Sequence, residues 1–209
     1  MRKAPARAQA KTKQQIVSEF RRTEIVNAAR TVFARRGFAL GIMDEIAREA
    51  GVAKGTVYLY FKSKTDIYKA VLDHDMKALK MSTLERIDAV AGLKAKIRAF
   101  VLVRLENAEA NKEFFRIMDS ASDNLSFTRS QYRDWLREPV HRLTLEIEKA
   151  ARKGEIRRLD AEKTAWLVAD MTRGTIQRRL LAQNGAPVAA DAEFLLDFIW
   201  ASLEARPAR

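Results

Sequence analysis

The sequence predicts an all-α protein with two helical parts, and two observations lead to that class. Glycine and proline are scarce, with 8 and 4 residues in a chain of 209, and Ala, Leu, Arg, Glu and Lys, which favour helices, are abundant. Apolar side chains recur every three to four residues along much of the chain, which is the period of a helix with one buried face. No stretch shows the strict apolar and polar alternation of a half-exposed strand.

Composition also indicates the cellular compartment in which the protein is expected. The chain has no cysteine, so neither disulfides nor thiolate metal sites can stabilise it, as expected in a reducing cytoplasm. No run approaches the roughly 18 apolar residues of a membrane span, and no apolar signal-peptide segment follows the basic N-terminus. We therefore expect a cytoplasmic protein, with no membrane partner, whose apolar residues build the core.

The net charge of +12 is concentrated near the N-terminus. Residues 1–64 carry 14 basic and 5 acidic side chains, whereas the other 145 residues carry 25 and 22. Such a field attracts polyanions, and nucleic-acid binding that depends on it weakens with salt. A solvated surface is the alternative, and charge alone does not decide between the two.

Helical spacing and stop residues divide the chain into a tail and two domains. Residues 1–17 are basic with few large apolar groups, so we expect a flexible tail. The first domain, 18–64, is predicted to hold three helices at 18–36, 43–50 and 54–61, after which Ser63 caps a long helix that starts at Lys64. The second domain, 65–209, is predicted to continue with helices at 93–111, 112–120, 128–153, 160–184 and 190–205.

The two short helices fit a helix-turn-helix. Ala47, four residues before Gly51, is small enough for a close helix crossing, and Gly51 can adopt the left-handed backbone of a tight turn. The second helix has no acidic residue, so it suits a phosphate-lined groove, although a plain helical hairpin with a glycine corner is the alternative. The expected apolar contacts between the helices are Ile46, Ala50, Val52 and Val57, and the expected outward side chains are Lys54, Thr56, Tyr58 and Tyr60.

A specific resemblance lies in residues 43–64, MDEIAREAGVAKGTVYLYFKSK, and extends over about 18–72. This segment strongly resembles the N-terminal domain of TetR-family regulators, in which the second helix of the motif reads DNA. The likeness implies groove contacts by Lys54, Gly55, Thr56 and Tyr58, and phosphate contacts by Tyr60 and Lys64. Two positions depart from the family pattern, because Gly41 and Ala53 stand where a threonine and a serine that can bind phosphate are common.

The resemblance also implies a role for the second domain. In proteins like TetR this region forms a ligand cavity, and its last two helices pair with a second subunit, which implies a homodimer on a palindromic operator and an unknown small-molecule effector. Arg104 lies on an apolar stripe and would need a partner if buried: an ion pair with Asp170 or a ligand. For any single aromatic side chain, packing in the core is the favoured alternative to lining a cavity. The candidate cavity residues are Phe100, Arg104, Met118, Trp135, Trp166 and Asp170.

The last helix carries two apolar stripes on different sides. A helix on the surface of a monomer needs only one apolar face, so we expect a second subunit to cover the other stripe, with deep burial in its own subunit as the alternative. One stripe is Phe194, Leu195, Phe198 and Ile199; the other, predicted as the dimer interface, is Leu196, Trp200 and Leu203.

No catalytic, metal or cofactor site is predicted. His74 and His141 are the only histidines, and the acids beside His74 point away from one another on a helix. Phosphate loops, dinucleotide fingerprints and Ser-x-x-Lys motifs are absent from the sequence. We expect not an enzyme but a sequence-specific DNA-binding transcriptional regulator, a repressor that a small molecule releases from its operator. A constitutive DNA-binding accessory protein without an effector, or a helical protein-interaction module, remains the alternative.

Overall fold

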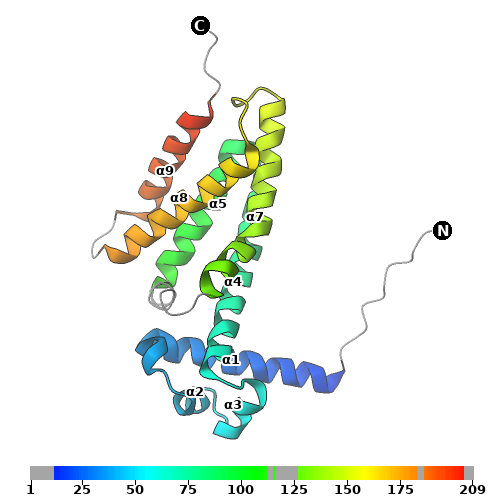
Figure 1. The fold of residues 1–209 in the computed structure, drawn as a ribbon, viewed down its shortest axis with the longest axis vertical. Helices are drawn as coiled ribbons and strands as arrows, with labels where there is room; N and C mark the ends of the chain where they lie inside the picture. The colour runs from blue at the N-terminus through cyan, green and yellow to red at the C-terminus, as the bar shows by residue number, and fades with distance from the viewer. Residues whose placement is uncertain (1–11, 113–114, 116–126, 183–185, 205–209) are drawn as a thin grey trace, which may run out of the picture. The chain divides into compact units, whose positions relative to one another are not determined.

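The computed structural model describes residues 12–112, 115, 127–182 and 186–204, and these residues form helices and no strand (Figure 1). The predicted all-α class is therefore confirmed. The chain divides after Leu72 into two compact units. The division falls inside helix α4 (Lys64–Asp88), further along than the sequence-based boundary at 64, because Ile67 and Tyr68 are buried in the core of the first unit.

The first unit contains α1 (Lys13–Leu40), α2 (Met43–Glu49), α3 (Lys54–Tyr60) and the start of α4. Helix α1 begins earlier than predicted, so residues 13–17 are helical rather than part of a flexible tail. A capping box explains this start, since Thr12 and Gln15 each accept a hydrogen bond from the other's backbone N–H. Gly37 has φ 73°, which kinks α1 directly after residue 36, where the sequence predicted the helix to end. Ser63 caps α4 as predicted, accepting from the N–H of Asp66 at 3.1 Å.

An aromatic cluster fills the core of the first unit. The rings of Phe33 and Tyr68 meet edge to face with centroids 5.7 Å apart, and Phe38 lies 4.7 Å from Tyr68. Burial raises the pKa of the Tyr68 hydroxyl. Phe20, in the first half of α1, is exposed although it is a large apolar side chain.

The second unit packs around α5 (Leu93–Ala110), which contacts α7 (Phe127–Arg152), α8 (Ala161–Leu181) and α9 (Val188–Leu203) (Figure 1). Contact on several sides explains why α5 buries residues around much of its circumference, including the charged Lys96 and Arg104. The helix predicted at 112–120 lies mostly outside the described residues. In the described ranges no helix is long and apolar enough to cross a membrane.

A charge cluster joins α5, α8 and α9. Arg179 of α8 pairs with Glu109 of α5 at 3.0 Å and with Asp191 of α9, which also accepts from Arg178 at 2.7 Å. Burial raises the pKa of Asp191, but the hydrogen bonds from Arg178 and Arg179 outweigh it, so this pKa lies below its ordinary value. The ion pairs that Asp191 makes therefore contribute stability only while Asp191 is ionised.

The buried face of α9 differs from the prediction. Leu196 and Leu203, expected at a dimer interface, are each 2% exposed inside their own subunit, and Trp200 is half-buried beneath the Lys94 ammonium. The outward apolar side chains are Phe194 and Phe198, with exposed fractions of 75% and 61%. The cause is the packing of α9 against both α5 and α8, which covers more of the helix than one stripe.

Candidate DNA-binding surface and effector site

The helix-turn-helix has the geometry that the sequence predicted. Ala47 and Ile46 of α2 are buried, and Gly51 takes the left-handed backbone at φ 64°. The N–H of Val52 then donates to the carbonyl of Ala47 at 3.0 Å, which closes the turn between α2 and α3. Val57 is buried on the inner side of α3, whereas Val52 is half-buried. The inner face of α3 is thereby fixed on α2.

The outer face of α3 includes three exposed residues, Gly55, Tyr58 and Leu59, and the exposed Lys62 follows after the helix ends at Tyr60. Spacing of three and four residues places Gly55, Tyr58 and Leu59 on one side of the helix, opposite Val57. Leu59 is 83% exposed, although it was not among the DNA-binding residues expected from the sequence. The helical spacing from Gly55 would have placed it outward. An exposed leucine on such a face is suited to contact a thymine methyl group.

The other predicted DNA-binding residues occupy less prominent positions. Lys54 is exposed but pairs with Asp44 of α2 at 2.7 Å, and this hydrogen bond and charge raise its pKa. Thr56 and Tyr60 are half-buried on the flanks of α3. Lys64 is also half-buried, with its ammonium 4.7 Å from the centroid of the Phe38 ring. The structure thus brings all six to one small region, where Lys54, Gly55 and Tyr58 are exposed and the other three are half-buried.

The two departures from the family pattern have different structural settings. A Cβ on Gly41 would lie 2.8 Å from Cδ1 of the buried Phe33 ring, so this glycine allows a close approach that a threonine would prevent. The N-cap of α2 is Ile42, and that of α3 is Ala53; neither makes a side-chain capping hydrogen bond. Both short helices therefore start without a capping hydroxyl.

In the second unit Arg104 is 4% exposed. Its Nη2 donates to the Tyr132 hydroxyl at 2.6 Å, and its guanidinium lies 5.3 Å from the centroid of the Phe100 ring. Asp170, predicted as a partner, is exposed on α8 and makes no ion pair with Arg104, so that prediction was wrong. The error arose because residues on one helical stripe were assumed to be equally buried, whereas Asp170 of α8 is exposed to solvent.

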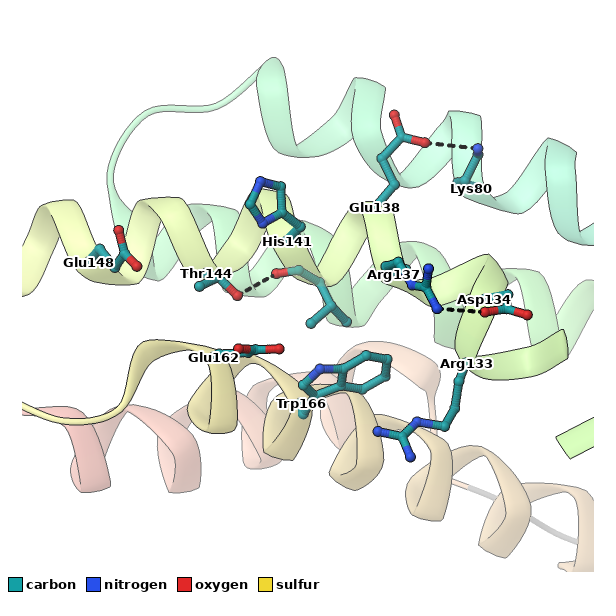
Figure 2. A pocket seen from close by; sticks show the side chains of 11 residues that line it. Lys80, Arg133, Asp134, Arg137, Glu138, His141, Thr144, Glu148, Glu162 and Trp166 are labelled. Atoms are coloured by element: carbon teal, nitrogen blue, oxygen red, sulfur yellow. Dashed lines mark hydrogen bonds and ion pairs between the residues drawn. The ribbon is translucent and has the colours of Figure 1, made fainter. Parts of the chain in front are cut away.

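The predicted ligand residues divide between two spaces. Arg104 and Trp135 line a cavity of about 10 Å³, and the buried Phe100 stacks beside Arg104. Trp166 instead lines an open cleft of about 1090 Å³ between α7 and α8, where Figure 2 shows its ring beside Arg133. Lys80 of α4 contributes to both spaces and pairs with Glu138 at 2.8 Å. Met118 lies outside the described residues.

Within the described ranges, no group of three or more histidine and acidic side chains could hold a metal ion. His74 contacts Asp75 at 3.3 Å, and His141 lines the cleft of Figure 2.

The fold and the exposed face of α3 define a DNA-binding helix-turn-helix protein. Residues 25–71 match the family model described as bacterial regulatory proteins, tetR family. The transcriptional regulator TtgR of Pseudomonas putida is 27% identical over 184 residues, which cover 84% of this chain and 88% of TtgR. The regulator TtgW of the same species is 30% identical over 46% of this chain and 71% of its own length.

A solved structure shares the fold over most of the chain. The regulator FadR of Bacillus subtilis, in complex with stearoyl-CoA, superimposes with a TM-score of 0.74 at 22% identity, covering 86% of this chain and 98% of FadR. The chain belongs to the TetR family of DNA-binding transcriptional regulators. The resemblance stated from the sequence is thereby confirmed.

Proposed function

We propose that the protein is a dimeric repressor that binds a palindromic operator and leaves it when a small molecule binds its second unit. The observation that carries the proposal is the outer face of α3, which exposes Tyr58 and Leu59 without any acidic residue and is followed by the exposed Lys62. A helix of this kind is suited to the major groove, where hydroxyls and apolar groups contact base edges and lysines contact phosphates.

The division of labour on this face gives a direct test. Tyr58→Ala and Leu59→Ala should each weaken specific binding by about 1–3 kcal/mol and change nonspecific binding less, because they remove base contacts. Lys64→Ala should weaken both together, because a phosphate contact carries no sequence information. Operator fragments selected from a random DNA pool provide the specific probe, and scrambled duplex provides the nonspecific one.

Lys94→Ala is a matched control for Lys64→Ala, because Lys94 is an exposed lysine of the second unit over the Trp200 ring. It should leave both affinities unchanged. If none of the α3 substitutions alters gel-shift titrations of the selected operator, α3 does not read the DNA.

A homodimer through α8 and α9 is the second part of the proposal. Phe194 and Phe198 lie one turn apart on α9, and Leu167 and Leu181 of α8 have exposed fractions of 59% and 80%. Gly174 lies midway between the two leucines, and a Cβ there would meet nothing within 4 Å, so a partner helix has room to approach. A two-fold dimer would cover these apolar groups and present two recognition helices to half-sites about 34 Å apart.

The third part of the proposal is a small-molecule effector that binds the second unit. Helix α4 is continuous from Lys64 to Asp88. Its first turns belong to the DNA-binding unit, and its later residues Met76 and Leu79 line the cavity of the second unit. A ligand that moves this end of α4 can therefore change the DNA-binding unit through one continuous helix. The FadR structure contains stearoyl-CoA, which supports a ligand-responsive role. A constitutive DNA-binding accessory protein would bind its operator equally with and without every compound tested.

A further inference from the structure

Arg104 is a buried charge that the described residues of the helical core do not neutralise. Its Nε is buried and has no hydrogen-bond partner, and Nη2 bonds only the neutral Tyr132 hydroxyl. No carboxylate among the described residues lies within ion-pair distance of it. Arg179 also has a buried, unpartnered Nε, but Asp191 and Glu109 neutralise its charge. Within the described part of the chain, Arg179 therefore has two carboxylate partners and Arg104 has none.

The aromatic rings around Arg104 compensate only part of its charge. The guanidinium lies 5.3 Å from the centroid of Phe100 and 5.9 Å from that of Tyr132. Ring faces attract a cation, but they do not accept the in-plane N–H groups that a carboxylate accepts in pairs. A charge removed from water without such an acceptor is costly. Natural proteins keep costly groups of this kind where binding needs them.

The cavity beside Arg104 has the lining of a site for an apolar molecule with one negative group. Apart from Arg104 and Lys80, its lining is hydrophobic or aromatic, and Glu138 already neutralises Lys80. The lining consists of Met76, Leu79, Lys80, Arg104, Tyr132, Trp135, Leu136 and Pro139. Arg104 is thus the one uncompensated charge of the cavity among these residues.

We propose that this cavity binds an organic carboxylate, whose two oxygens accept from Nε and a neighbouring Nη of Arg104 while its apolar body packs between α4, α5 and α7. The inference rests on the proposed effector role of the second unit and names the chemical class of that effector. The space of about 10 Å³ holds at most about one water molecule, so the ligand must displace lining side chains. Tyr132 and Trp135 are only half-buried and can move outward. Widening the cavity pushes on α4, which couples anion binding to the DNA-binding unit.

The test compares matched probes that share an apolar body and differ in charge. Octanoate, 1-octanol and octylammonium, and 2-naphthoate with 2-naphthol, are titrated into the full-length protein by thermal shift and calorimetry. We expect at least one carboxylate to raise the melting temperature by several degrees and to bind at least tenfold more tightly than its alcohol or ammonium analogue. This comparison needs no variant.

Arg104→Met keeps most of the side-chain volume and removes the charge. It should abolish the carboxylate response while leaving the melting temperature of the unliganded protein unchanged or higher, a combination that a structural arginine would not give. Arg133→Met, an exposed arginine next to Tyr132 on α7, is the matched control and should respond like the unmodified chain.

Equal stabilisation by the alcohol or ammonium probes, or a carboxylate response that survives in Arg104→Met, would overturn the carboxylate assignment and leave the effector role intact. Absence of stabilisation by every probe would overturn the assignment and count against the effector role as well. Operator binding by the unliganded protein is measured separately, so failure of the DNA-binding proposal is recognised independently.

Discussion

The pair Phe194→Glu and Phe198→Glu should convert the protein into a monomer that keeps its fold. Both side chains point outward, with exposed fractions of 75% and 61%, so substitution leaves the subunit core intact. If a phenylalanine offers about 200 Å², these fractions amount to roughly 270 Å² per subunit, or about 7 kcal/mol at ~25 cal/mol/Å² on full burial. The rotational and translational cost of association has to be offset by such burial, and it is of similar size.

Incomplete burial reduces that gain, and we take about half of it as realised in each subunit. The variant should therefore lose about 3–4 kcal/mol from each side of the interface. The two glutamates of each subunit also place four carboxylates in the dimer interface. Together these changes should raise the dimer dissociation constant by at least about a thousandfold. Sedimentation velocity at micromolar concentration measures the association state, and circular dichroism measures helix content. Leu145→Glu, which changes an exposed leucine of α7, is the control and should remain dimeric.

Operator binding should weaken together with dimerisation, because a monomer places only one recognition helix on a two-fold site. A doubly substituted chain that remains dimeric with normal helix content would refute the assignment of this face. Loss of helix content would instead show that the two rings stabilise the subunit itself.

Three further predictions concern stability. Gly41→Thr should destabilise the first unit by about 1–3 kcal/mol in urea unfolding, because the new Cβ would overlap the buried Phe33 ring; Gly55→Ala, which meets nothing within 4 Å, should change stability little. Gly51→Ala should cost about 1–2 kcal/mol in the same assay through its left-handed backbone at φ 64°, and a neutral result would contradict the strain argument. The pKa of Asp191 is lowered in the folded state, so the stabilisation that Asp191 contributes is present above the ordinary carboxyl pKa and disappears as pH falls through the folded pKa. Asp191→Asn should therefore reduce the loss of stability at acid pH in urea unfolding. An unchanged loss of stability at acid pH would argue against the cluster.

The DNA-binding motif could be predicted closely from the sequence because its determinants are local. Gly51 must take a left-handed backbone, Ala47 must be small, and Val57 must face inward, and each requirement concerns residues a few positions apart. The helix boundaries of α2 and α3 follow from the same short-range constraints. The start of α1 was predicted too late because the reciprocal hydrogen bonds of Thr12 and Gln15 were overlooked.

The second unit was less predictable because the burial of each side chain depends on which helices pack together. Helical spacing places Leu196 and Phe198 on different sides of α9, but it does not say which side meets α5 and α8. The same limit applies to Asp170, which shares a stripe with Trp166 but lies in solvent.

By itself the sequence determined the helical class, the helix-turn-helix and the family, because periodicity and turn chemistry are encoded within about one or two helical turns. Only the tertiary structure decided that Phe194 and Phe198 form the uncovered apolar side of α9, and that Arg104 is buried with no acid of the described residues within ion-pair distance. These properties depend on contacts between residues far apart in the chain, since burial and charge compensation are set by the neighbours that the fold supplies.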